Sequence, residues 1–275
     1  MANKYHGREI EACRAVMVEV FTILGEYRDR LALVGGWVPP MLVPESTEKH
    51  TGSLDIDLAV DANHVTSDTY ETIRKTLVRH GYEQSEQPFR FFRTFPFEGG
   101  TPVRVEVDFL AGEYGGTGGS HRTQPVQDLR ARKARGCDLV FDHTLKVRLS
   151  GTMPDGARNE VEIRIAGPVP FLVMKGMAHW SRKNPKDAYD IYWLVRHYPG
   201  GIETLQAELG KALPNPLILE GLAKIRSKFG SVDAVGPVWT AQFITPDPAG
   251  QERIARDAFE RVNALLSRLH IEPFR

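Results

Sequence analysis

Apolar residues in the first part of the chain repeat with helical spacing and then with strand spacing. Residues 8–30 carry apolar side chains three or four positions apart, which predicts an amphipathic helix. Residues 31–34 are all apolar and end at a glycine pair, which indicates a short buried strand. Prolines between residues 39 and 44 make the next segment irregular or a short helix. Residues 54–60 then alternate apolar and polar side chains, the period of a strand with one polar face.

Elements of both kinds continue as far as residue 167. We expect a helix over residues 67–81, which ends at a glycine, and a glycine-rich loop over residues 112–120 as a candidate mobile segment. The alternation of apolar and polar positions predicts further strands at residues 89–95, 103–110, 145–149 and 161–165.

The pattern becomes helical after the prolines at residues 168 and 170. Helical spacing of apolar positions predicts helices at residues 171–181, 185–197, 202–213 and 251–269. We therefore predict an α/β (α+β) protein in two domains. Residues 1–167 form a mixed β-sheet flanked by helices, and residues 168–275 form a helical C-terminal domain.

The bulk composition is that of an ordinary globular protein. The 275 residues include 35 basic and 35 acidic side chains, so the formal net charge is zero. No apolar run approaches the roughly 20 residues that cross a bilayer, and the first residues lack the apolar core of a secretory signal. The two cysteines, Cys13 and Cys137, indicate neither a zinc site nor a disulfide framework. We expect a cytoplasmic protein that does not associate with membranes.

Three carboxylates stand on strands that should share one sheet. Asp55 and Asp57 fall on the same face of their strand because side chains alternate with a period of two. Asp108 lies on a second predicted strand. Mg²⁺ prefers oxygen ligands and keeps positions for substrate phosphates, and three such carboxylates suit a two-metal site for in-line phosphoryl chemistry. Asp108 could also accept the proton of the attacking hydroxyl group. The alternative is that Asp55 and Asp57 form only the polar face of an edge strand.

Small residues upstream of the aspartates suit the binding of phosphate. Gly35 and Gly36 end a predicted strand, where backbone N–H groups can approach phosphate oxygens. Ser53 precedes Asp55 by two positions, and its hydroxyl could bind a phosphate or brace the turn. Trp37 is suited equally to stacking on a base and to a place in the core.

The predicted helical domain carries a second constellation of charges. Lys175 and Arg182 are seven residues apart and Lys186 and Asp190 four apart, so each pair shares one helix face. Cations on such a face would neutralise triphosphate charge as pyrophosphate leaves. For Asp187 and Asp190 the alternative is an ion-paired helix surface, or capping of a helix that begins at a proline.

These stretches resemble the nucleotidyltransferase superfamily with a DNA-polymerase-β-like core, and within it the AbiEii/MenT type, the toxin of type IV toxin–antitoxin pairs. The matching motifs are LVGGW at residues 33–37, HTGSLDIDL at 50–58, VEVDFL at 105–110, and K-x-x-A-x-x-x-R-x-x-x-K-D-x-x-D at 175–190. The resemblance implies a nucleotidyltransferase core in which Asp55, Asp57 and Asp108 hold Mg²⁺ or Mn²⁺. It implies catalytic roles for these three residues and for Lys175 and Asp190. The residues expected to bind the nucleotide are Gly35, Gly36, Ser53, Lys175, Arg182, Lys186 and Asp187.

The activity implied is transfer of a nucleotide from an NTP onto an acceptor, as in transferases of the EC 2.7.7 type. For the MenT branch the acceptor is the 3′ end of a tRNA; a protein acceptor and a cognate antitoxin protein are the other expected partners. Two alternatives remain open. One is modification of a small molecule such as an aminoglycoside, with an acidic pocket drawn from Glu106, Glu113 and Asp128. The other is a catalytically silent relative that only binds a nucleotide.

Overall fold

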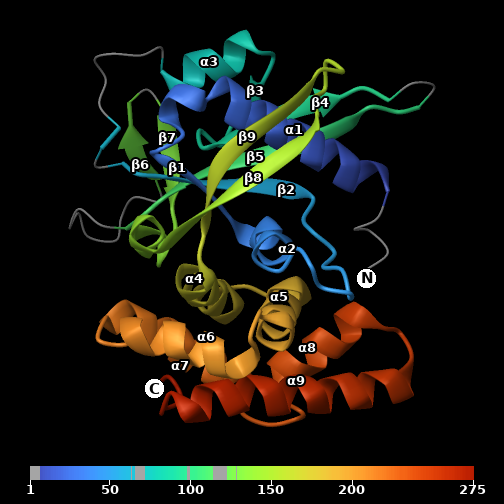
Figure 1. Cartoon of the computed structure of the whole chain (residues 1–275), viewed down its shortest axis with the longest axis vertical. Coiled ribbons are helices and arrows are strands. Elements are labelled where there is room, and N and C mark those ends of the chain that lie inside the picture. Colours follow the sequence, from blue (N-terminus) through green and yellow to red (C-terminus); the bar gives the residue numbers. More distant parts are fainter. Residues whose placement is uncertain (1–6, 63, 66–71, 98–99, 114–122, 128) are drawn as a thin grey trace. The chain divides into compact units, whose positions relative to one another are not determined.

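The computed structural model of the chain describes residues 7–62, 64–65, 72–97, 100–113, 123–127 and 129–275. These residues form two compact units (Figure 1). Of the described residues, those between 7 and 38 and between 52 and 166 form the sheet unit, and those between 39 and 51 and between 167 and 275 form the helical unit. Within the described ranges the chain therefore passes between the units at residues 38/39, 51/52 and 166/167.

The strands of the sheet unit join into one mixed sheet of nine strands, as far as the chain is described. The order is β3-β4-β5-β2-β1-β9-β8, and β7 continues the sheet beside the end of β5 and pairs with β6. The central pair β2 and β5 is parallel, whereas β1–β2 and β4–β5 are antiparallel. The bounds are β1 (Leu31–Val34), β2 (Asp55–Val60), β3 (Glu83–Gln84), β4 (Arg90–Phe95), β5 (Val103–Ala111), β6 (Thr123–Val126), β7 (Leu129–Lys133), β8 (Thr144–Thr152) and β9 (Arg158–Ala166).

One face of this sheet is covered by α1 (Arg8–Ile23), which packs against β5, β8 and β9. Val105 and Val107 of β5 lie on this covered face and are fully buried. Arg93 of β4 also points to it, because it forms a two-bond ion pair with Glu19 of α1. Side chains at even positions of β5 therefore project from the other face.

Two predicted helices of the sheet unit differ from the structure. The helix predicted over residues 8–30 is wrong beyond Ile23, because Leu24 ends α1 and a short 3-10 helix, η2 (Gly25–Tyr27), follows. The described part of the segment 67–81 forms α3 (Ile73–Arg79), whose first turn is capped by the Thr72 hydroxyl. Residues 66–71 and 114–122 lie outside the described residues, as do the predicted start of that helix and most of the predicted loop 112–120.

Three helices of the helical unit begin with the same arrangement, a capping Asn or Asp followed by a proline. Asn184, Asn215 and Asp247 each accept a bond from a backbone N–H of the first turn, and a proline follows each of them. Proline is favoured there because its missing N–H would have no partner in the helix. The helices are α4 (Pro168–Ser181), α5 (Pro185–His197), α6 (Gly201–Ala212), α7 (Pro216–Lys228), α8 (Val235–Ile244) and α9 (Pro248–Arg268).

Close packing of α4 against α7 depends on a pair of glycines. A Cβ atom at Gly176 would overlap the carbonyl oxygen of Gly221, and one at Gly221 would overlap Val173. The four helices predicted for this region are confirmed within a few residues at each end. The prediction missed α7 and α8; α8 has no polar face, and Gly236 and Pro237 interrupt its sequence.

The predicted fold class, a mixed α/β protein with a sheet followed by C-terminal helices, is confirmed (Figure 1). Contacts place residues 39–51 with the helices, although they precede most of the sheet in sequence. Compact units are not by themselves independently folding domains, so the division at residues 167/168 stays a prediction. In the described part of the chain, no helix combines the length and apolar character needed to cross a membrane.

Candidate functional site

Four carboxylates share one face of the sheet unit, which we call the acidic face: Asp55, Asp57, Glu106 and Asp108. Asp55 lies beside Glu106, and Asp57 lies beside Asp108, in the register of the parallel strands β2 and β5. Residues paired across strands point to the same side of a sheet. This is the face opposite α1. The predicted grouping of Asp55, Asp57 and Asp108 on neighbouring strands is therefore present in the structure.

Gly35 makes room for the carboxylate of Asp57. The glycine follows β1 at a positive φ of 74°, and a Cβ atom there would overlap Asp57 Oδ2. Both the backbone conformation and the close approach require glycine. Gly36 is buried in the same short 3-10 helix, η3 (Gly35–Trp37). Trp37 is only 5% exposed, so its ring lies in the protein interior.

We expect Gly35→Ala to displace Asp57. The nucleotide transfer that the sequence motifs predict for Asp57 should then fall by about 100-fold, because small misplacements at a reacting centre cost about that much. The added methyl group meets a carboxylate, and the backbone conformation becomes strained as well. Gly156→Ala is the matched control. It also changes a glycine at positive φ, 87°, but a Cβ atom there meets nothing within 4 Å. Equal activity losses in the two variants would contradict a local role for Gly35.

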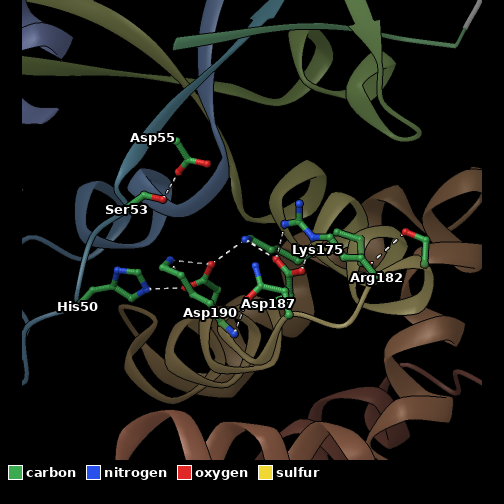
Figure 2. Close-up of polar contacts among 11 residues, drawn as sticks. His50, Ser53, Asp55, Lys175, Arg182, Asp187 and Asp190 are labelled. Carbon is green, nitrogen blue, oxygen red and sulfur yellow. Dashed lines mark hydrogen bonds and ion pairs between the residues drawn. The ribbon is translucent and has the colours of Figure 1, made fainter. Parts of the chain in front are cut away.

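Hydrogen bonds and ion pairs hold Asp55, Glu106 and Asp108 on the acidic face. The Ser53 hydroxyl donates to Asp55 Oδ1 (Figure 2). Arg90, on β4, donates from Nε and Nη2 to the two oxygens of Asp108, at 2.8 and 2.9 Å. Arg90 Nη2 also lies 2.6 Å from Glu106 Oε1. Ser53 thus braces the strand start, which is one of the two roles predicted for it.

The acidic face carries an excess of negative charge. Among the described residues, Arg90 pairs with two of these carboxylates, and the Nη1 of Arg132 lies 4.0 Å from Asp108 Oδ2. Burial, followed by the negative charge of Asp108, raises the pKa of Glu106 to about 7. The sequence prediction missed Glu106 as a member of this group, although its even position on β5 was a usable signal.

The oxygen donors of this face are those that Mg²⁺ prefers, and their excess charge favours a bound cation. As they stand, however, the described residues include no group of three His, Cys, Asp or Glu side chains arranged to hold a metal ion. Arg90 and Ser53 engage Asp108 and Asp55 in this conformation. The residue types therefore fit a metal, and binding it requires these side chains to rearrange.

The helical unit contains an ion cluster (Figure 2), formed by Lys175, Arg182, Lys186, Asp187 and Asp190. All of its members are buried except Arg182, whose side chain is 50% exposed. Lys175 Nζ lies 2.9 Å from Asp187 Oδ1 and 2.6 Å from Asp190 Oδ2. Arg182 forms a two-bond fork with Asp187 at 2.7 and 2.8 Å. Lys186 bonds both oxygens of Asp190, at 2.8 and 3.1 Å. Both aspartates are completely buried.

Electrostatic pairing outweighs the cost of burying these charges. Burial alone would lower the pKa of Lys175, but Asp187 and Asp190 hold that pKa above its ordinary value. Burial alone would raise the pKa of Asp190, but Lys175 and Lys186 hold it well below its ordinary value. Lys175 and Lys186 thus have carboxylate partners inside the helical unit. Whether the cluster also binds a nucleotide stays a prediction.

His50 belongs to the same cluster, and the sequence prediction did not include it. Its Nε2 lies 3.0 Å from Asp190 Oδ1. Burial lowers the pKa of His50 to about 4, so near neutral pH the ring is uncharged and donates from Nε2. The ring also stacks on Tyr189 and meets Trp193 edge-on. His50 therefore attaches residues 39–51 to α5.

His179 is a buried imidazole whose two ring nitrogens have no hydrogen-bond partner among the described residues. It is 1% exposed and packs beside Phe229 and Trp239. Burial lowers its pKa to about 4. A folded-state pKa below the unfolded value of about 6.5 means that the unfolded chain binds the extra proton, so stability falls as the pH drops from 6.5 towards 4.

We expect His179→Leu to reduce this acid sensitivity of the helical unit. Between pH 7 and pH 5 the wild type should lose about 2 kcal/mol more unfolding free energy than the variant does. Urea unfolding at the two pH values measures the difference. His270→Asn, which changes an exposed ring, is the control and should follow the wild type. A parallel pH dependence of wild type and His179→Leu would contradict the prediction.

No protein-family model matches this chain, and no curated protein matches it significantly. The resemblance to AbiEii/MenT-type nucleotidyltransferases therefore rests on the sequence motifs. The predicted site residues fall into two groups, each within one unit. Gly35, Gly36, Ser53, Asp55, Asp57 and Asp108 lie in the sheet unit, and Lys175, Arg182, Lys186, Asp187 and Asp190 lie in the helical unit.

Proposed function

We propose that the protein is a metal-dependent nucleotidyltransferase that moves a nucleoside monophosphate from an NTP onto an acceptor. The observation that carries the proposal is the register of β2 and β5, which sets Asp57 beside Asp108 and Asp55 beside Glu106. Clustered carboxylates on one sheet face are costly unless cations bind among them. A structural role alone does not explain why the fold keeps four.

In this proposal Asp55, Asp57 and Asp108 would hold Mg²⁺ or Mn²⁺, which supplies charge neutralisation for the phosphates. The acceptor hydroxyl attacks the α-phosphorus of the NTP, and the bond from that phosphorus to the bridging oxygen breaks. Pyrophosphate leaves, and the hydroxyl proton passes to Asp108. The backbone N–H groups at Gly35 and Gly36 are suited to donate to phosphate oxygens beside Asp57.

We further propose that the acceptor is RNA, at the 3′ end of a tRNA, with a protein as the alternative acceptor. Together with the resemblance of the motifs to the AbiEii/MenT type, this makes the chain the toxin of a type IV toxin–antitoxin pair. A cognate antitoxin protein is then its expected partner. Overexpression of the wild type should arrest growth, and co-expression of a small protein encoded beside it should relieve the arrest.

The direct test is transfer of label from each of the four α-³²P-NTPs, with Mg²⁺, to total tRNA and to cell protein. We expect incorporation that requires the metal and is lost with EDTA. Label on an aminoglycoside but on neither macromolecule would favour the small-molecule alternative. If no acceptor is labelled and the affinity for NTP is indifferent to Mg²⁺, the chain is a silent nucleotide-binding protein and the proposal fails.

A further inference from the structure

Arg90 forms the strongest set of contacts on the acidic face, and the proposed reaction does not use it. It lies opposite Asp108 in the antiparallel register of β4 and β5. Its fork covers both oxygens of Asp108, and Nη2 reaches Glu106 as well. The Asp108 side chain is only 4% exposed. The guanidinium is thus the main positive charge among the carboxylates of β5.

A divalent cation and this guanidinium compete for the same oxygens. The fork uses one lone pair on each oxygen of Asp108, and Arg90 cannot lose its proton at accessible pH. A metal on Asp108 would lie within a few ångströms of the guanidinium and be repelled by it. The guanidinium and the metal therefore each weaken the binding of the other to Asp108.

We propose that Arg90 determines the metal affinity of the acidic face: it is an internal counter-ion whose fork to Asp108 opens when a divalent metal binds. This inference rests on the proposed function, since it assumes a metal at Asp57 and Asp108. Glu106 provides the alternative partner, because Nη2 already lies 2.6 Å from its Oε1. Arg90 can therefore release Asp108 without losing every carboxylate contact. In the wild type, metal then binds weakly until nucleotide phosphates add their own negative charge.

The test is a titration of the full chain with Mn²⁺, followed by electron paramagnetic resonance of the free ion, without nucleotide. We expect Arg90→Gln to bind Mn²⁺ at least tenfold more tightly than the wild type, or about 1.4 kcal/mol. Arg93→Gln is a closely matched control. Arg93 lies on the same strand, forms the same two-bond fork with a buried carboxylate and is equally exposed, 22% against 24%, but points to the opposite face. It should leave the Mn²⁺ affinity unchanged.

A second measurement needs no substitution at Arg90 and so covers the case in which Arg90→Gln does not fold. The Nε–Hε signal of Arg90 in a ¹H–¹⁵N spectrum of the wild type should shift as Mg²⁺ is added. The corresponding signal of Arg93 should stay in place. Both signals are assigned in the wild type by through-bond correlation with the assigned backbone. As a separate check, Arg90→Lys, which keeps a charge but cannot form the fork, should bind Mn²⁺ with intermediate affinity.

The outcomes separate the two proposals. The role of Arg90 is overturned if Arg90→Gln binds Mn²⁺ no more tightly than the wild type, or if Mg²⁺ binds and leaves the Arg90 signal unchanged. When label transfer is observed in the same experiments, the proposed function still stands. If neither the wild type nor Arg90→Gln binds Mn²⁺ and no acceptor is labelled, the proposed function fails together with the role of Arg90.

Discussion

Asp57→Asn should lower nucleotide transfer by about 1,000-fold or more while the protein stays folded. Two features of the acidic face involve Asp57 directly: Gly35 leaves room for its carboxylate, and Asp108 lies beside it on the neighbouring strand. The amide has nearly the same shape but lacks the charge that a divalent metal requires. Loss of one charge among four carboxylates relieves repulsion, so the unfolding free energy should change by less than about 1 kcal/mol.

The measurement is the initial rate of label transfer at saturating Mg²⁺ and NTP, together with urea unfolding of the same samples. Asp61→Asn is the control, because Asp61 follows the end of β2 directly and pairs with Arg30 and His64. It should transfer at the wild-type rate. An active Asp57→Asn enzyme would refute the assignment of this face as the catalytic centre.

Asp190→Asn should destabilise the helical unit by about 3–5 kcal/mol, because it removes one partner from a buried ion cluster. Lys175 and Lys186 would each lose a charged contact inside the protein, and the bond to His50 would weaken. The loss would be larger than that of most single substitutions. Urea unfolding followed by tryptophan fluorescence measures it, since Trp193 packs against His50.

Asp233→Asn is the control for this cluster. It makes the same chemical change at an exposed position of the helical unit and should alter stability by no more than about 0.5 kcal/mol. The result also bears on what the K-D-x-x-D motif does. An Asp190→Asn variant that is as stable as the wild type but inactive would mean that Asp190 acts in catalysis and not in holding the cluster together.

Local signals predicted the elements of the fold best where they were strongest. The apolar run at residues 31–34, the alternation at 54–60 and the helix start at Pro185 each predicted one element, and the structure has all three. The strand β7 was missed because Arg130, Arg132 and Lys133 make it look like a solvated basic face. The pairing of β7 with β5 is a long-range contact that composition does not reveal.

For the candidate site as well, local sequence patterns predicted some placements of residues, whereas others depend on long-range pairing of strands. Period-two alternation placed Asp55 and Asp57 on one face, and a neighbouring strand supplied Asp108. Nothing local indicated that Arg90 would lie opposite Asp108, since register depends on the turn between β4 and β5. Lys175 and Lys186 were predicted to bind the nucleotide, which stays a prediction, and in the structure each has a buried carboxylate partner. Helical spacing does not tell a buried ion pair from a cationic surface.

The assignment of residues 39–51 to the helical unit has a consequence for how the chain is made. His50 and its partner Asp190 are 140 residues apart in sequence. At ordinary rates of synthesis, Asp190 leaves the ribosome on the order of ten seconds after His50. Until then the ring of His50 has neither Asp190 nor Tyr189 and Trp193 to pack against. The contact between His50 and the ion cluster can therefore form only after residue 190 has emerged, and a nascent chain released before that point would lack it.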